Sequence, residues 1–170
     1  MIFRQAVAAD LERAIEIMNA AIVRLGAAGV DQWQHGYPNA ERLKSDVEEG
    51  IGYVLVKDDE VVAYGAMVFT GEPAYAEIAD GEWLTSEGDY AVVHRMCVAE
   101  EYVGKGYGHR FMAEAERVAA QSKRSMRVDT HADNKVMQHL MPSMGYTYCG
   151  IIYFESRYLT AFEKILNPEI

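Results

Sequence analysis

Three glycines at alternate positions, in the run Val103-Gly104-Lys105-Gly106-Tyr107-Gly108, are the residues of this sequence best suited to hold a ligand. Glycine lets the backbone approach a ligand closely, with its N–H groups turned inward. A helix predicted to start here adds further free N–H groups and the positive end of its dipole. Lys105 adds a cation beside the same loop. The run therefore predicts a phosphate-binding loop, the alternative being a plain glycine-rich turn.

Two other phosphate-binding motifs fit this run poorly. A P-loop needs Lys followed by Ser or Thr, whereas Lys105 is followed by Gly106. A dinucleotide-binding fingerprint needs G-x-G-x-x-G, and the third glycine here arrives one residue early. Asp129 nevertheless stands near the end of the next predicted strand, where a ribose-binding acid is expected. A dinucleotide-binding oxidoreductase domain therefore stays open as an alternative.

Hydrophobic periodicity and turn residues predict the elements that position this loop. Strands are expected at 2–6, 52–56, 61–69, 90–98, 126–131, 146–154 and 158–166, and helices at 11–25, 41–49, 106–122 and 134–143. Asp10 is expected to cap the first helix, and Pro142 with Gly145 to stop the last. An early hairpin followed by one strand–helix–strand unit predicts an α/β chain with a mixed α+β sheet. Helices should cover both faces of this sheet, in one domain over residues 1–170.

The stretch from Cys97-Val98 through Val103 to Gly108 resembles the acyl-CoA signature of the GNAT superfamily of N-acetyltransferases. The superfamily pattern is Arg/Gln-x-x-Gly-x-Gly/Ala at the start of a helix. The resemblance extends to Asp129-Thr130-His131, to Asn134, and to Gly145-Tyr146 in place of the family's Gly-Phe. With the element order it covers nearly the whole chain, and 94–98 with 129–134 read like one bacterial branch of the superfamily. It implies a GNAT-like acyl-CoA N-acyltransferase fold, whose mostly antiparallel central sheet splays at one parallel βαβ unit.

The same resemblance implies acetyl-CoA as co-substrate and direct transfer of its acetyl group to a primary amine, with no metal. A backbone N–H near Val98 would polarise the thioester carbonyl. The Asn134 side chain would hold the pantetheine arm, although an asparagine satisfied by its local turn is the alternative. The residues implied to contact the coenzyme are Met96, Cys97, Val98, Val103, Gly104, Lys105, Gly106, Tyr107, Gly108, His109 and Asn134.

Two positions depart from the family pattern. Val103 stands at the Arg/Gln position, so the grip on the pyrophosphate should come from backbone N–H groups alone. Met141 stands where many members have a tyrosine that protonates the leaving thiolate, and methionine cannot donate a proton. A free thiol has a pKa near ~8.5, so a thiolate leaves fairly well without an acid. The departure at Met141 also permits a non-catalytic CoA-binding or sensing domain.

Transfer to an amine requires the amine to be unprotonated, which calls for a general base. His94 is the first candidate, because imidazole is largely neutral at physiological pH. Strand alternation places it on one face with Val92 and Met96, and a histidine satisfied within the sheet is the alternative. Tyr146 is the candidate acid, although a packing aromatic is equally typical of its position. Further candidates are Glu77, Asp80 and Glu82 as bases acting through water, and Tyr148 and Tyr153 as acids.

An acceptor pocket is expected in the two non-periodic regions, because these carry aromatic and acidic residues. The stretch 71–90 holds Glu72, Glu77, Asp80, Glu82, Glu87 and Asp89 without a Lys or Arg. The aromatic residues of the two regions are Trp33, Tyr37, Tyr75 and Trp83. Together with Glu77 they are candidates for a box around an ammonium group, the alternative being aromatics that only pack the loops down.

Composition narrows the class of protein without naming the acceptor. A chain of 170 residues with a formal charge of −10 argues against nucleic-acid binding. The N-terminal segment lacks the apolar core of a signal peptide, and no run of consecutive apolar residues is long enough to span a membrane. Cys97 and Cys149 have no metal-type spacing, so reduced thiols in a cytoplasmic protein are expected. The acceptor should be a small-molecule or peptide amine, and family habit also allows a homodimer.

Overall fold

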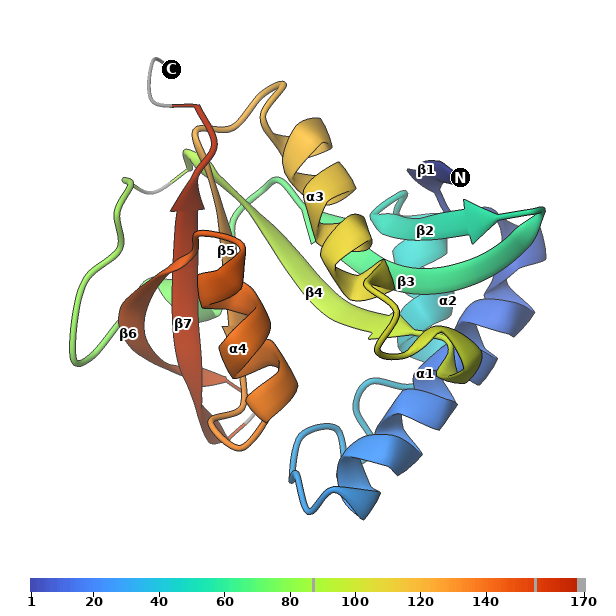
Figure 1. Ribbon diagram of the computed structural model, residues 1–170. Helices are drawn as coiled ribbons and strands as arrows, with labels where there is room; N and C mark the ends of the chain where they lie inside the picture. The colour runs from blue at the N-terminus through green and yellow to red at the C-terminus, as the bar shows by residue number, and fades with distance from the viewer. Residues whose placement is uncertain (87, 155, 168–170) are drawn as a thin grey trace. The chain divides into compact units, whose positions relative to one another are not determined.

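The computed structural model describes residues 1–86, 88–154 and 156–167, and the chain forms two compact units. The first unit comprises Met1–Met67 and Arg95–Glu114, and the second comprises Val68–His94 and Ala115–Ile170. Strand β4 (Tyr90–Val98) and helix α3 (Tyr107–Ala119) each run from one unit into the other (Figure 1). Each unit is described separately below.

The first unit is built on the antiparallel strands β1 (Ile2–Gln5), β2 (Gly52–Lys57) and β3 (Glu60–Val68). The end of β4 follows β3, with Ala99 N–H donating to Val62 O at 2.9 Å. Between β2 and β3, Asp58 and Asp59 have φ values of 49° and 65°. Positive φ at both central residues is the conformation that a two-residue hairpin turn requires. The predicted hairpin is therefore confirmed.

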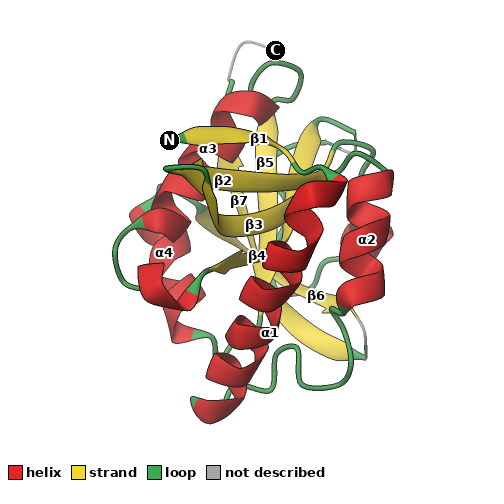
Figure 2. Ribbon diagram, turned by 90° about the vertical axis from the view of Figure 1, so that its right-hand side faces the viewer, coloured by secondary structure: helices red, strands yellow, loops and turns green. Residues whose placement is uncertain are grey.

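Helices α1 (Leu11–Ala27) and α2 (Ala40–Glu48) pack against each other and cover one face of these strands (Figure 2). Alternation along β3 sends Tyr64 toward the two helices and leaves Gly65 on the opposite face. There Phe111 of α3 lies so close that a Cβ on Gly65 would stand 2.7 Å from its ring. A glycine at position 65 thus lets the first half of α3 pack directly onto the strand.

In the second unit the strand order is β4-β5-β7-β6, with β5 (Ser125–Thr130), β6 (Thr147–Phe154) and β7 (Arg157–Ile165). Strands β4 and β5 are parallel, whereas β5–β7 and β6–β7 are antiparallel. The parallel pairing joins 90–92 to 125–127, and within the described residues β4 and β5 have no further paired positions. The predicted mixed, mostly antiparallel sheet with one parallel βαβ unit is confirmed.

The two faces of the second unit carry different elements. Arg127 and Asp129 of β5 lie on the face that the non-periodic stretch covers, through the short 3-10 helix Pro73–Tyr75. Met126 lies on the opposite face by alternation, and so does Lys164, its partner on β7, which bonds Glu116 of α3 at 2.6 Å. Helix α4 (Lys135–Ser143) packs against β6.

The non-periodic stretch is attached to the outer edge of β6. Ala79 and Ile151 exchange two backbone hydrogen bonds of 2.9 and 2.8 Å. Two glycines make this approach possible. A Cβ on Gly81 would stand 2.1 Å from Cys149 O, and one on Gly150 would stand 2.4 Å from Ala79 O. A side chain at either glycine would therefore push the two backbones apart.

Two predicted details at helix ends are wrong, whereas the extents of α3 and α4 agree with the prediction. Asp10 does not cap α1 with its side chain; its carboxylate accepts from Val7 N–H at 2.8 Å and from the Arg4 guanidinium at 2.6 and 2.9 Å. Pro142 lies inside α4, which continues to Ser143, because a proline in the last turn removes only one helical N–H. Helix α3 begins at Tyr107 and ends at Ala119, within the predicted range 106–122. Among the described residues, none of the helices is both long enough and apolar enough to span a bilayer.

Candidate active site

The glycine loop of the first unit has the open backbone that a ligand cradle needs. Gly104 and Gly106 have φ values of 74° and 83°, a left-handed conformation that side chains disfavour. A Cβ built on either glycine would meet no atom within 4 Å, so the space beside both is open. Gly108 is different, since it lies in the first turn of α3. The motif therefore contains two conformational glycines and one helical glycine.

The backbone N–H groups of this loop point to an anion site. The first helical bond of α3 runs from Arg110 N–H to Gly106 O at 3.0 Å. Within the described chain, no carbonyl accepts from the N–H groups of Tyr107, Gly108 or His109, nor from those of Gly104 and Gly106. Unpaired N–H groups gathered at the start of a helix favour phosphate. The loop thus fits the pyrophosphate of a coenzyme A molecule.

The side chains of the loop contribute less than its backbone. Val103 is 40% exposed and its side chain carries no polar atom. Lys105 is exposed and its Nζ donates to Glu101 O at 2.7 Å. Tyr107 packs edge-on against Tyr102 at 4.9 Å between ring centroids. The side chain of His109 is exposed.

Strand β4 leads into this loop, and its backbone N–H groups, not its cysteine thiol, are suited to contact a ligand. The Cys97 side chain is buried in the core beneath α1, and burial raises its pKa to about 12. A thiol held protonated in this way is a poor nucleophile. Because Ala99 N–H donates to Val62 O, the N–H of Val98 points away from β3 by alternation. The predicted shared face of Val92, His94 and Met96 is interrupted, because Arg95 has a φ of 57° in mid-strand.

A buried charged network holds Arg95 in this unusual conformation. Its guanidinium donates to Asp46 at 2.9 and 2.8 Å and to the Tyr37 hydroxyl at 2.6 Å. Asp46 is 0% exposed and also accepts from Arg42 Nε at 2.9 Å and from the Tyr64 hydroxyl at 2.8 Å. A residue at positive φ persists where its surroundings over-determine it. Asp46 is therefore the anchor of the distorted segment of β4.

In the second unit, His94 lies among acidic and aromatic side chains. Its Nε2 is 3.0 Å from Glu72 Oε2, and its Nδ1 is 4.0 Å from Asp129 Oδ2. The side chains of His94, Glu72 and Asp129 are 11%, 16% and 12% exposed. The hydroxyl of Tyr75 donates to Asp129 at 2.5 Å, and burial together with this carboxylate raises the pKa of Tyr75. The structure thus surrounds the candidate base with two mostly buried carboxylates and a protonated phenol.

The candidate acids lie apart from this group. Tyr146 is buried beside Glu116 on the face opposite His94, and burial raises the pKa of its hydroxyl. Met141 is fully buried in α4. Asn134 is the N-cap of α4, and its Oδ1 accepts from Met137 N–H at 3.2 Å. Tyr148 and Tyr153 are 47% and 57% exposed.

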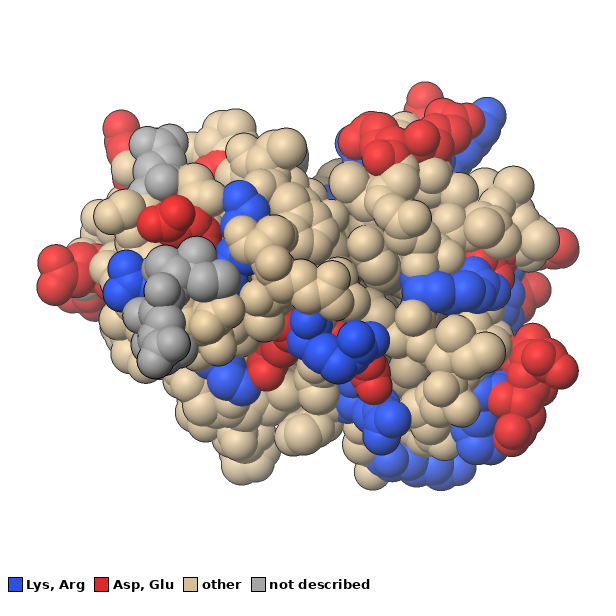
Figure 3. All heavy atoms as spheres, turned by 90° about the horizontal axis from the view of Figure 1, so that it is seen from above, with Lys and Arg blue, Asp and Glu red and all other residues tan. Residues whose placement is uncertain are grey.

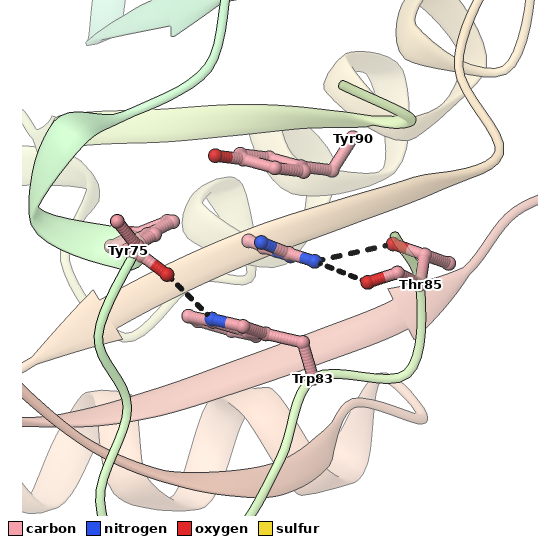
Figure 4. A pocket seen from close by; sticks show the side chains of 6 residues that line it. Tyr75, Trp83, Thr85 and Tyr90 are labelled. Carbon is pink, nitrogen blue, oxygen red and sulfur yellow. Dashed lines mark hydrogen bonds between the residues drawn. The ribbon is translucent and has the colours of Figure 1, made fainter. Parts of the chain in front are cut away.

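The predicted aromatic box of the second unit already holds a cation of the protein itself. Figure 4 shows Tyr90 and Trp83 on two sides of a small cavity, with Tyr75 beside them. The Arg127 guanidinium lies 3.7 Å from the Tyr90 ring centroid and 4.1 Å from that of Trp83. In the first unit, Tyr37 binds Arg95, and Trp33 packs against the core beneath α1. The Arg127 guanidinium therefore occupies the space between Trp83 and Tyr90, and the role of Trp33, Tyr37, Tyr75 and Trp83 toward a substrate ammonium stays a prediction.

Most acids of the non-periodic stretch face solvent. Glu77, Asp80 and Glu82 are exposed, and Asp80 accepts from the Tyr148 hydroxyl at 3.3 Å. Glu87 lies outside the described residues. On the face seen in Figure 3, acidic side chains form several separate groups with basic and uncharged residues between them. Among the described residues, no three His, Cys, Asp or Glu side chains are grouped to hold a metal ion.

Comparison with known proteins decides the family. The model of the Acetyltransferase (GNAT) family matches residues 17–146, which is more than half of the chain. The chain belongs to the GNAT acetyltransferase family. The prediction drawn from the glycine loop and its neighbours is thereby confirmed at the level of the family.

Individual relatives of this GNAT protein agree with the assignment. The Uncharacterized N-acetyltransferase YesJ of Bacillus subtilis (strain 168) is 26% identical over 129 residues, covering 75% of this chain and 68% of that protein. A GNAT-family acetyltransferase structure from Streptococcus agalactiae 2603 is similar with a TM-score of 0.90 and 27% identity, covering 96% and 94% of the two chains. The structure of yncA, a putative acetyltransferase from Salmonella typhimurium with its cofactor acetyl-CoA, has a TM-score of 0.68 and 19% identity. It covers 100% of this chain and 96% of that one, and at this identity it shows the shared fold.

Three residues of this GNAT chain were not singled out as site residues by the sequence. Glu72 is one acid among several in a stretch without periodicity. Its position directly before Pro73, as N-cap of the short helix, is the sequence feature that could have distinguished it. Asp46 lies in a helix that reads as polar and solvated. Arg127 is the one basic residue in a strand otherwise suited to burial, which was a usable signal, because a buried arginine needs partners.

Proposed function

We propose that this chain transfers an acetyl group from acetyl-CoA directly to a primary amine. The observation that carries the proposal is the set of unpaired N–H groups around Gly104 and Gly106 at the start of α3. Acetyl-CoA supplies an activated acetyl group and a thiolate that leaves. The structure of yncA with its cofactor acetyl-CoA supports this choice of donor. The family model spans parts of both units, which supports residues 1–170 acting as a single acetyltransferase domain.

The backbone of residues 104–109 would hold the pyrophosphate, and the N–H of Val98 would face the thioester carbonyl. Lys105 would add a cation once its Nζ leaves Glu101 O. Asn134, which caps α4, is the proposed contact of the pantetheine arm. Direct transfer agrees with the buried, protonated Cys97, because no acyl-cysteine is needed.

His94 is the proposed general base. With an ionised Glu72 at 3.0 Å, the proton of the neutral imidazole belongs on Nε2, which leaves Nδ1 to accept a proton from the attacking amine. Asp129, 4.0 Å from Nδ1, stabilises the imidazolium that forms. The two carboxylates also favour an acceptor that arrives as an ammonium ion. The acceptor is therefore proposed to be a cationic small-molecule or peptide amine.

The test is acetyl-CoA consumption over a panel of primary amines, with His94→Gln compared to His139→Gln. His139 is an exposed histidine of the second unit and serves as the matched control. We expect His94→Gln to lower kcat by roughly 10²- to 10⁴-fold at neutral pH, while the control stays near the parent value. The loss should shrink as pH rises, because more of the amine is then already deprotonated. Acetyl-CoA affinity, followed by thermal shift, should be unchanged in both variants.

Three outcomes contradict the proposal in different ways. Stabilisation by acetyl-CoA without turnover of any amine would favour the alternative of a non-catalytic coenzyme-sensing domain. Stabilisation by NAD and not by acetyl-CoA would favour the dinucleotide-binding alternative. Equal kcat values for His94→Gln and His139→Gln would refute the role of His94 alone.

A further inference from the structure

The second unit contains a cavity of about 130 Å³ that the proposed transfer reaction does not use. It is lined by Tyr75, Ala76, Trp83, Thr85, Tyr90 and Arg127 (Figure 4). A water molecule occupies about 30 Å³ of liquid, so the cavity has room for roughly four waters or a small organic molecule. Three of its walls are aromatic, and its one charged group is the Arg127 guanidinium.

Several N–H donors of Arg127 have no hydrogen-bond acceptor among the described residues. The residue is 2% exposed, yet only Nη2 donates, to Thr85 O at 2.7 Å and to Thr85 Oγ1 at 3.4 Å. Its Nε is buried without a hydrogen-bond partner, and within the described chain Nη1 makes no hydrogen bond. A guanidinium carries five N–H donors, and leaving buried charged donors unpaired is costly. A buried guanidinium with unused N–H donors at the wall of a cavity points to a ligand that accepts hydrogen bonds.

Glu163 neutralises Arg127 without using up these donors. Its Oε1 lies 3.2 Å from Arg127 Nε, outside hydrogen-bonding geometry. The carboxylate of Glu163 already accepts from Leu84 N–H at 2.6 Å, from Ser125 Oγ at 2.5 Å, and from Thr85 Oγ1. Glu163 is thus satisfied by neutral donors and holds its charge fixed beside the guanidinium. The end of the guanidinium that carries Nη1 stays available to a second acceptor.

Two aromatic rings fix the plane of the Arg127 guanidinium. The Tyr90 and Trp83 ring centroids lie 3.7 and 4.1 Å from the central carbon of the guanidinium. These are contact distances for stacked carbon atoms, so the guanidinium itself fills the layer between the two rings and its plane is fixed. A carboxylate in the plane of the guanidinium can accept from Nη1, and as a monoanion it is repelled less by the nearby Glu163 carboxylate than inorganic phosphate, which is largely dianionic at neutral pH.

We propose that this cavity binds the carboxylate of a small organic acid, hydrogen-bonded to Arg127 at its Nη1. The inference does not depend on the proposed transfer reaction, although two wall residues also contact the surroundings of His94: the Tyr75 hydroxyl donates to Asp129, and the Tyr90 hydroxyl accepts from Glu72 N–H. The ligand replaces the missing acceptors of a buried guanidinium.

The test uses Trp83 as the reporter, in a chain carrying Trp33→Phe so that a single tryptophan remains. Acetate and benzoate are titrated at constant ionic strength, and Trp83 emission is followed together with the thermal midpoint. We expect saturable changes in both signals with the carboxylates and none with inorganic phosphate or chloride. Arg127→Lys keeps the charge and loses the planar donors, and it should weaken carboxylate binding about tenfold or more.

A second variant avoids the risk that Arg127→Lys fails to fold. Ala76→Leu places a larger side chain at the cavity wall and leaves Arg127 and Glu163 in place, and it too should abolish the response. Ala8→Leu, at an exposed alanine of the first unit, should leave it unchanged. Responses to carboxylate that do not saturate, that phosphate reproduces, or that survive Ala76→Leu would overturn the proposal.

Discussion

Replacing Asp46 by asparagine removes one negative charge from the centre of the first unit. The carboxylate is 0% exposed and accepts from Arg95 at 2.9 and 2.8 Å, from Arg42 at 2.9 Å and from the Tyr64 hydroxyl at 2.8 Å. The Arg95 side chain is 7% exposed, so it would remain as a buried cation without its counter-ion. Asparagine also presents an NH₂ group to the two guanidinium groups, which offer only donors.

Breaking a buried ion pair by removing one partner costs about 3–5 kcal/mol, so Asp46→Asn should lower the free energy of unfolding by that amount. Glu49→Gln is the matched control, because Glu49 binds the same Arg42 at 2.9 Å but its side chain is 55% exposed. An exposed pair contributes less than about 1 kcal/mol. Urea unfolding at neutral pH would measure both values, with the slope of the transition checked for two-state behaviour.

A double variant tests whether the loss comes from the charge left on Arg95. Asp46→Asn combined with Arg95→Met removes both members of the pair, and it should be less destabilised than the sum of the two single variants. A loss for Asp46→Asn no larger than that for Glu49→Gln would refute the reasoning. Simple additivity in the double variant would refute it as well.

Two further predictions concern the coenzyme loop and acid stability. In a calorimetric titration, Val103→Ala should leave acetyl-CoA affinity nearly unchanged, whereas Gly106→Val should abolish it, because Gly106 has a φ of 83° and borders open space. The control is Gly29→Val, at a φ of 75° with equally open surroundings. It imposes similar backbone strain and should retain affinity. Equal losses at Val103 and Gly106 would contradict a backbone cradle. The hydrogen bond from Arg4 lowers the pKa of Asp10, so this carboxylate stabilises the fold above its unfolded pKa of about 3.9 and ceases to do so as pH falls through the lower folded value. Asp10→Asn should therefore reduce the urea midpoint clearly at pH 7 and progressively less as the pH is lowered below about 3.9, and a reduction that stays the same over this range would show that the charge is not the cause.

The elements of this chain could be predicted because each is encoded locally. The hairpin is encoded by Asp58 and Asp59 between two apolar runs, and strand β4 is bounded as predicted at Tyr90 and Val98. The glycine loop could be read for the same reason, since its glycines and the helix that follows are neighbours in sequence. Periodicity and turn chemistry describe contacts between residues a few positions apart, and the hairpin, the strand and the loop depend only on such contacts.

The surroundings of the candidate base could not be predicted, because they depend on contacts between distant residues. Glu72 meets His94 across 22 residues, from a stretch that has no periodicity. The contact of Asp46 with Arg95 spans 49 residues, and a helix that reads as solvated gives no sign that one of its acids is buried. The sequence cannot show which cation a loop aromatic such as Trp83 stacks on, and here that cation is Arg127.

The pair of hydrogen bonds between Ala79 and Ile151 also bears on protein engineering. Strand β6 is the last strand of its sheet, and an uncovered edge strand is a template for pairing with another chain. Shortening the 71–89 segment to admit larger acceptors would remove this cover along with any pocket wall. We expect such a deletion to lose solubility before it changes selectivity. A charged residue introduced at the outward edge of β6 should therefore accompany any such deletion, because it would oppose pairing of this edge with another chain.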